Sequence, residues 1–149
     1  MTDSAADRRF LRQAIELSRG CPPSDTAFSV GAVLVSADGA VLATGYSRES
    51  DPHDHAEEAA LAKVAGQRWP GATIYSSLEP CLRRLSRPRS CCALIAAAGI
   101  TRVVLAWREP PIFVPGGGAE WLQARGVLVT EVPELAAEAR AVNAHLLPG

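Results

Sequence analysis

Hydrophobic and polar positions follow two periods along this chain and divide it into helices and strands. In the N-terminal part, apolar side chains recur at helical spacing, at Phe10, Leu11, Ala14, Ile15 and Leu17. This period predicts an amphipathic helix. Ser4 with Asp7 three residues later matches a capping box at the helix start. Gly20, followed by two prolines, predicts its end.

The rest of the chain alternates between β-rich and helical patterns. We expect strands at 27–36, 41–46, 72–77, 102–107 and 127–132. Asp38-Gly39 is a hairpin signal between the first two strands. We expect further helices at 57–65, 91–98, 119–125 and 133–147. Irregular segments rich in arginine and proline at 79–89, and in proline and glycine at 110–118, separate these elements.

This order of elements predicts an α/β fold. A hairpin followed by alternating helices and strands indicates a mixed five-stranded sheet covered by helices, a three-layer α-β-α sandwich. Right-handed crossovers favour parallel neighbours for the third to fifth strands, and active sites of such sheets lie at strand ends and helix N-termini. The length of 149 residues fits one domain, 1–149.

Composition excludes several classes of protein. Fifteen basic and sixteen acidic side chains give a net charge of −1, so we do not expect a nucleic-acid partner bound by bulk electrostatics. The longest apolar run, 93–100, is too short to span a bilayer, and the N-terminus lacks the apolar stretch of a secretory signal. We therefore expect a cytoplasmic protein with no membrane partner and with reduced thiols.

Residues suited to zinc catalysis stand before three predicted helices. They are His55 with Glu57, then Cys81 after a proline, then Cys91. One imidazole and two thiolates suit Zn²⁺, and three protein ligands leave a position open for water, as in catalytic sites. Glu57 is the candidate acid-base that moves protons between this water and a substrate. A helix N-terminus would also favour the thiolate at Cys91.

These motifs resemble those of the cytidine deaminase superfamily. Segment 28–32, Phe-Ser-Val-Gly-Ala, resembles a Phe-x-Val-Gly-Ala strand of cytidine deaminases. Segment 76–81, Ser-Ser-Leu-Glu-Pro-Cys, resembles the Thr-Leu-Glu-Pro-Cys segment of the deaminase domain in riboflavin biosynthesis. Segment 97–104 resembles the helix-to-strand turn that follows in that domain. The resemblance covers roughly residues 5–132.

The resemblance implies a role for each matching residue. It implies that His55, Cys81 and Cys91 are zinc ligands and that Glu57 is the proton shuttle. It also implies substrate contacts by the Ser77 carbonyl on the leaving amine, by the Phe28 ring on the base and by Glu49 on a ribose. Members of the family commonly form dimers or tetramers, so the resemblance implies a homo-oligomer.

The chain departs from the family pattern at two places. Nine residues separate Cys81 from Cys91, against two in the commonest pattern and usually eight in the riboflavin-type domain. Cys92 is adjacent, and we choose Cys91 as the ligand because it falls nearer the predicted helix start. The riboflavin-type asparagine is missing from segment 26–28, and we do not expect the reductase domain that often accompanies the riboflavin-type deaminase domain.

Other candidates have two readings each. The arginines of the irregular segment form a solvated loop or grip a substrate phosphate in a fork; they are Arg83, Arg84, Arg87 and Arg89. We take Arg84, close to Cys81, as the candidate substrate contact. We expect His53 to be a loop residue and the rings of Trp107 and Phe113 to be buried in the core.

Together, these features predict a zinc-dependent hydrolytic deaminase that removes an exocyclic amine from a pyrimidine nucleoside, nucleotide or related aminopyrimidine. Phe28 and Glu49 favour a cytidine-like compound, whereas the insert before Cys91 and the arginines favour a ribose phosphate like the riboflavin-pathway intermediate. Two alternatives remain open. One is a deaminase of guanine or adenine, and the other is a structural zinc protein, which would normally need a fourth protein ligand.

Overall fold

The computed structural model of the chain describes residues 4–84, 87–113 and 116–148. Leu85 and Ser86 of the predicted segment 79–89, and Val114 and Pro115 of the predicted segment 110–118, lie outside the described residues. The described part is organised around one sheet. Its strands are β1 (Gly31–Val35), β2 (Val41–Tyr46), β3 (Thr73–Ser76), β4 (Arg102–Leu105) and β5 (Leu128–Glu131).

The sheet is mixed and has the order β2-β1-β3-β4-β5. Strand β1 pairs antiparallel with both β2 and β3, and β3, β4 and β5 pair in parallel. The parallel arrangement of the last three strands confirms the prediction. The carboxyl ends of β3 and β4 therefore lie at one edge, where the loops after them meet.

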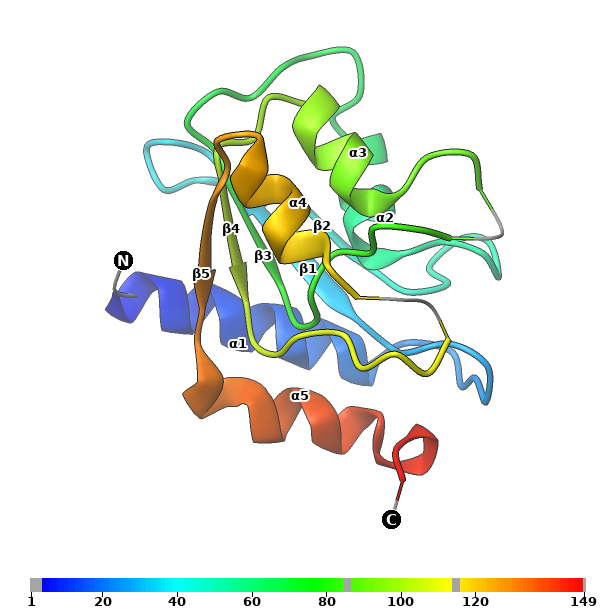
Figure 1. The fold of residues 1–149 in the computed structure, drawn as a ribbon. Helices are drawn as coiled ribbons and strands as arrows, with labels where there is room; N and C mark the ends of the chain where they lie inside the picture. Colours follow the sequence, from blue (N-terminus) through cyan, green and yellow to red (C-terminus); the bar gives the residue numbers. More distant parts are fainter. Residues whose placement is uncertain (1–3, 85–86, 114–115, 149) are drawn as a thin grey trace.

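Helices cover both faces of the sheet (Figure 1). Helices α1 (Ala5–Arg19) and α5 (Ala136–Val142) lie on one face. On the other face lie α2 (Ala56–Ala62), α3 (Cys91–Ala97) and α4 (Gly118–Ala124). The predicted three-layer sandwich is therefore confirmed. None of the helices in the described ranges combines the length and apolar character needed to cross a membrane.

Two glycines let a helix approach each face of the hairpin. A Cβ on Gly31 would lie 1.9 Å from the Ala14 carbonyl oxygen of α1. A Cβ on Gly45 would lie 2.4 Å from the Ala56 carbonyl oxygen of α2. Only glycine fits such close contact with a helix backbone. Gly45 thus sets the depth of α2, which begins directly after His55.

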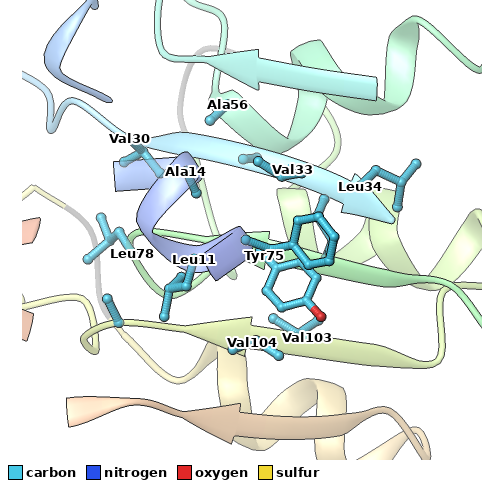
Figure 2. Close-up of a cluster of buried hydrophobic side chains, with 14 of the residues drawn as sticks. Leu11, Ala14, Val30, Val33, Leu34, Ala56, Tyr75, Leu78, Val103 and Val104 are labelled. Atoms are coloured by element: carbon cyan, nitrogen blue, oxygen red, sulfur yellow. The ribbon is translucent and has the colours of Figure 1, made fainter. Parts of the chain in front are cut away.

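The core lies between the sheet and its helices. Leu11 and Ala14 of α1 pack with Tyr75 of β3 and Val104 of β4, all of them buried (Figure 2). These positions include the apolar stripe that the helical period predicts for α1. The sheet is therefore a fixed base for the loops at its edge.

A buried ion pair ties the start of α1 to the sheet. Arg102 donates through both terminal nitrogens to the Asp7 carboxylate, at 2.8 Å each, and the Tyr75 hydroxyl donates to it at 2.7 Å. Asp7 also accepts from the Ser4 backbone N–H, and its own N–H donates to the Ser4 hydroxyl. The predicted capping box is confirmed. Its Asp7 carboxylate also joins α1 to strands β3 and β4.

The first strand is shorter than predicted, because residues 27–30 lie outside it. The amide of Asn143 accepts from the Ser29 N–H at 2.7 Å and donates to the Ser29 carbonyl at 3.0 Å. The Val30 N–H donates to the Ser47 hydroxyl at 2.9 Å. Side chains thus take the backbone groups that a strand would pair, and the ladder begins at Gly31.

Two predicted helices are also shorter than the pattern suggests. Residues 63–65 do not continue α2. Their backbone N–H groups donate to carbonyls three residues earlier, as in a tight turn. The predicted helix 133–147 divides into a 3-10 turn (Pro133–Leu135), α5 and a second 3-10 turn (Ala144–Leu146). Asn143, whose amide is bound to Ser29, lies at the second break. Tertiary hydrogen bonds replace the regular helix there.

Candidate metal centre and active site

Three donor atoms from distant parts of the chain converge beside the sheet edge. His55 Nδ1 lies 3.5 Å from Cys81 Sγ and 3.4 Å from Cys91 Sγ. All three donor atoms lie within 4.8 Å of one another. The structure thus brings together the three residues that the sequence proposes as ligands.

These separations fit zinc. Zinc–sulfur bonds of about 2.3 Å and zinc–nitrogen bonds of about 2.0–2.1 Å at tetrahedral angles place nitrogen and sulfur about 3.5 Å apart. Within the described ranges, this group of potential ligands has three members and no fourth. A closed structural site would need a fourth, so the donor set favours a catalytic site over a structural one.

Local structure explains how each donor reaches this point. His55 is the N-cap of α2. Cys81 lies in the loop after β3, directly behind Pro80. Cys91 is the first residue of α3, after the N-cap Ser90. The Ser90 hydroxyl accepts from the Ala93 N–H at 3.1 Å, as a helix N-cap does. Two helix starts and one strand end therefore face one another.

The structure separates Cys91 from Cys92. The Cys92 thiol contacts the Pro80 carbonyl at 3.4 Å and the Gly118 carbonyl at 3.7 Å, and its side chain is buried. Burial is the largest of the effects that raise the pKa of Cys92. Cys92 therefore packs against α4 as a thiol, and Cys91 alone of the two faces His55.

The two candidate sulfur ligands share a hydrogen bond. The contact with the Cys91 side chain is the largest effect that lowers the pKa of Cys81, to about 4. The same contact is the largest effect that raises the pKa of Cys91. The Cys91 backbone N–H also donates to Cys81 Sγ at 3.3 Å. Metal binding at this pair must displace a proton, as thiolate ligation requires.

Glu57 lies beside the donor group as the second residue of α2. It is 3% exposed, and the Ser76 hydroxyl donates to its Oε2 at 3.1 Å. Burial, followed by the negative charge of Cys81, raises the pKa of Glu57. A raised pKa suits a carboxyl group that must both accept and release a proton near neutral pH.

A cavity of about 670 Å³ opens onto this group. His55, Glu57 and Cys81 line it together with the ring of Phe28. Phe28 packs edge-on against Phe113, with the ring centroids 5.1 Å apart, and against Trp107 at 5.7 Å. The expectation of core burial holds for Trp107, which is 4% exposed. It is wrong for Phe113, which is 38% exposed and lines the cavity.

Two proposed substrate contacts do not line this cavity. Glu49 accepts from the Tyr46 N–H at 3.3 Å and pairs with Lys63 at 2.7 Å, so its carboxylate is held at the hairpin and not beside a ligand. Ser77 is buried, and its hydroxyl accepts from the Gly31 N–H at 3.1 Å. The contacts that the resemblance implies for Glu49 and for the Ser77 carbonyl stay predictions.

Arg84 lines the cavity but also holds the metal-binding loop. Its Nη2 donates to the His53 carbonyl at 2.7 Å and to Glu58 Oε1 at 3.2 Å. The same Glu58 oxygen accepts from the His55 N–H at 3.2 Å. Arg87 pairs with the same carboxylate group and with Asp51 and Asp54. Both arginines are thus engaged with acids of the loop before α2, and His53 is an exposed loop residue as expected.

The sequence motifs gave no role to several residues that the structure places in the site. Ser76 and Glu58 hold Glu57 and His55, respectively, and Glu109 lines the cavity. Arg48 also lines it and donates to the Pro22 and Phe28 carbonyls, which fixes the loop that carries Phe28. The rule that sites lie beyond the carboxyl ends of parallel strands would have pointed to Glu109, which closely follows β4.

The fold and the donor set define a class: a domain with a three-ligand metal site that suits zinc and a buried acid beside it. The model of the family "cytidine and deoxycytidylate deaminase zinc-binding region" matches residues 4–107. This match covers more than half of the chain, and the chain belongs to that family.

Curated relatives agree with this assignment. The chain is 40% identical over 126 residues to the diaminohydroxyphosphoribosylamino-pyrimidine deaminase of Schizosaccharomyces pombe, covering 82% of the chain and 31% of the relative. It is 37% identical over 126 residues to riboflavin biosynthesis protein RibD of Escherichia coli, covering 83% and 33%. The chain thus spans about a third of these relatives.

Solved structures share the fold. Acinetobacter baumannii RibD superposes with a TM-score of 0.81 at 30% identity, covering 95% of this chain and 39% of that one. The Aspergillus oryzae Rib2 deaminase superposes with a TM-score of 0.80 at 27% identity, covering 91% of this chain and 89% of that one. The deaminase fold predicted from the sequence is therefore confirmed.

Proposed function

We propose that the chain removes an exocyclic amine from an aminopyrimidine ribose phosphate by hydrolysis and releases ammonia. One observation carries the proposal: the three metal donors and the buried Glu57 lie together beside a cavity of about 670 Å³. That volume suits a small ligand, since ligand cavities commonly measure about 300–1,000 Å³.

His55, Cys81 and Cys91 would hold the zinc ion. When bound, zinc supplies a water whose pKa is lowered to about 7. Glu57 would carry two protons in turn, both from the attacking water: the first to the ring nitrogen and the second to the leaving amine. Burial raises the pKa of Glu57 toward the value that this exchange requires, and the Ser76 hydroxyl orients its carboxylate.

The proposed ring lies against Phe28, and the proposed phosphate lies near Arg84. Arg84 lines the cavity, and its Nε and Nη1 atoms are buried without a partner among the described residues. A guanidinium group with spare donors favours an anionic group on the ligand. The name of the S. pombe relative, a diaminohydroxyphosphoribosylamino-pyrimidine deaminase, points to the same class of substrate.

A cytidine-like nucleotide is the second candidate. The family name and the position of Phe28 in the cavity favour it. The ion pair between Glu49 and Lys63 weakens it, because Glu49 is the residue expected to bind the ribose. The expected homo-oligomer and the cytoplasmic location stay predictions.

A matched pair of variants tests the proposed function. Ammonia release should occur with an aminopyrimidine ribose phosphate in the parent and fall by about 10²–10⁴-fold in Glu57→Gln, since a general acid-base contributes that much. Zinc content should remain near one per chain. The control is Glu138→Gln, an exposed substitution on α5 that should leave ammonia release unchanged. Equal rates for Glu57→Gln and the parent would exclude the proposed mechanism.

A further inference from the structure

A second carboxyl group lines the cavity, and the proposed reaction leaves it without a task. Glu109 follows β4 and lies among the cavity residues. Its backbone N–H donates to Glu79 Oε1 at 2.9 Å, and Glu79 Oε2 accepts from the Ala119 N–H at 2.8 Å. These bonds hold the backbone of Glu109 in place beside the cavity.

The Glu109 carboxylate itself has neither a hydrogen-bond nor an ion-pair partner in the parts of the chain that the structure describes. Burial, then the charges of Cys81, Glu57 and Glu79, raise its pKa to about 8. The nearby Arg108 pairs instead with Glu120 and Glu131. A half-buried carboxylate that lines a cavity and has no partner among the described residues is free to accept hydrogen bonds from a ligand.

The surroundings of Glu109 indicate which ligand groups would do so. The carboxyl groups of Glu57 and Glu79 lie close enough to Glu109 to raise its pKa, so this part of the cavity disfavours an anion and favours N–H donors. The rings of Phe28 and Phe113 supply an apolar wall for a flat heterocycle. A carboxylate that accepts hydrogen bonds from amino groups is charge-assisted and therefore strong.

The two candidate pyrimidines differ in such donors. When its leaving amine and adjacent ring nitrogen are engaged by the metal site and Glu57, a cytosine ring has only a carbonyl acceptor and C–H groups left. A pyrimidinone with further amino substituents still has N–H donors. Donors and acceptors at buried positions discriminate between ligands more strongly than apolar shape does.

We propose that Glu109 is a specificity-determining residue whose carboxylate accepts hydrogen bonds from amino groups of the pyrimidine other than the leaving amine. The inference rests on the proposed function and adds a selection for amino-substituted pyrimidinones over cytosine.

Calorimetric binding of two bases to the zinc-loaded protein tests this inference. The bases are uracil and 5,6-diaminouracil, which differ only in two amino groups. The parent should prefer the diamino base by roughly tenfold or more, since hydrogen bonds to a charged group contribute at least that much. The preference should fall to within about threefold in Glu109→Gln and survive in part in Glu109→Asp.

Controls make each outcome decisive. Glu120→Gln removes an exposed carboxylate on α4 and should keep the preference. Because the Glu109 carboxylate has no partner, Glu109→Gln should unfold at the same temperature as the parent or higher. A marked loss of stability in that variant, or an unchanged preference, would overturn the inference while ammonia release by the parent still supports the proposed function. If the parent binds neither base and releases no ammonia, the proposed function fails together with the inference.

Discussion

Replacing each of the two adjacent cysteines by serine tests the metal centre most directly. Both thiols are fully buried and adjacent in sequence, so the two variants share chemistry and local burial. They differ in what the sulfur contacts. Cys91 Sγ lies 3.4 Å from His55 Nδ1, whereas Cys92 Sγ contacts the carbonyls of Pro80 and Gly118. We expect Cys91→Ser to lose zinc and Cys92→Ser to keep it.

The magnitudes follow from these contacts. Zinc bound by four protein ligands contributes about 10–16 kcal/mol, or roughly 2.5–4 kcal/mol per ligand. Losing the Cys91 thiolate should therefore weaken zinc binding by about 10²–10³-fold. Cys92→Ser removes a buried sulfur, and its shorter hydroxyl can still donate to a carbonyl. That change should cost about 1–2 kcal/mol of unfolding free energy, with little change in zinc affinity.

Competition with a chelator of known zinc affinity measures the first effect, and urea unfolding with zinc in excess measures the second. Cys21→Ser, at a half-buried thiol that contacts the Val30 carbonyl, gives the baseline for losing any cysteine. If Cys92→Ser loses zinc while Cys91→Ser retains it, the assignment of the third ligand is wrong. If both retain it, the metal is not held by this pair of helix-start residues.

Two further predictions concern Glu57 and the fold. Ser76→Ala removes the hydroxyl that donates to Glu57, so kcat should fall about tenfold with KM nearly unchanged. The acidic limb of the kcat–pH profile should move to higher pH, because that hydrogen bond lowers the pKa of Glu57. Asp7→Asn should lower the free energy of unfolding at pH 7 by about 3 kcal/mol, since it breaks a buried pair with Arg102.

The pH dependence of the Asp7 prediction has a definite sign. Hydrogen bonds from Arg102 hold the pKa of Asp7 in the folded protein well below its ordinary value of 3.8. The stabilisation is therefore complete above that ordinary value and is lost as the pH falls below it. Urea unfolding should show a large difference between parent and Asp7→Asn at pH 7 and a smaller one near pH 3. A difference that is equal at both pH values would contradict the role given to the ion pair. For Ser76→Ala, a rise in KM with unchanged kcat would contradict the role given to the hydrogen bond between Ser76 and Glu57.

Much of the architecture could be predicted because its causes are local. The capping box at Ser4, the hairpin at Asp38-Gly39 and the cap at Ser90 each act within a few residues. The alternation of strands and helices then leaves few arrangements for a sheet. Predictions failed at residues 27–30 and near Asn143, where hydrogen bonds join segments 114 residues apart. No local period reports such contacts.

In the candidate site too, some residues could be predicted from local sequence and others depend on tertiary packing. His55, Glu57, Cys81 and Cys91 could be named from the sequence because zinc accepts few donor types and because each residue stands at a predicted element boundary. The contacts proposed for Glu49 and for the Ser77 carbonyl stay predictions; in the structure Glu49 pairs with Lys63, and the Ser77 hydroxyl accepts from the Gly31 N–H. Their surroundings depend on how the hairpin packs.

The sequence by itself determined the order of elements, the donor types and the acid beside them, because periodicity, capping and ligand chemistry are properties of short segments. Only the tertiary structure decided that Cys91 and not Cys92 faces His55, that Arg84 is bound to Glu58, and that Glu109 lines the cavity. The physical reason is that these choices depend on where loops from distant strand and helix ends meet. The relative positions of these loops are set by packing across the whole sheet.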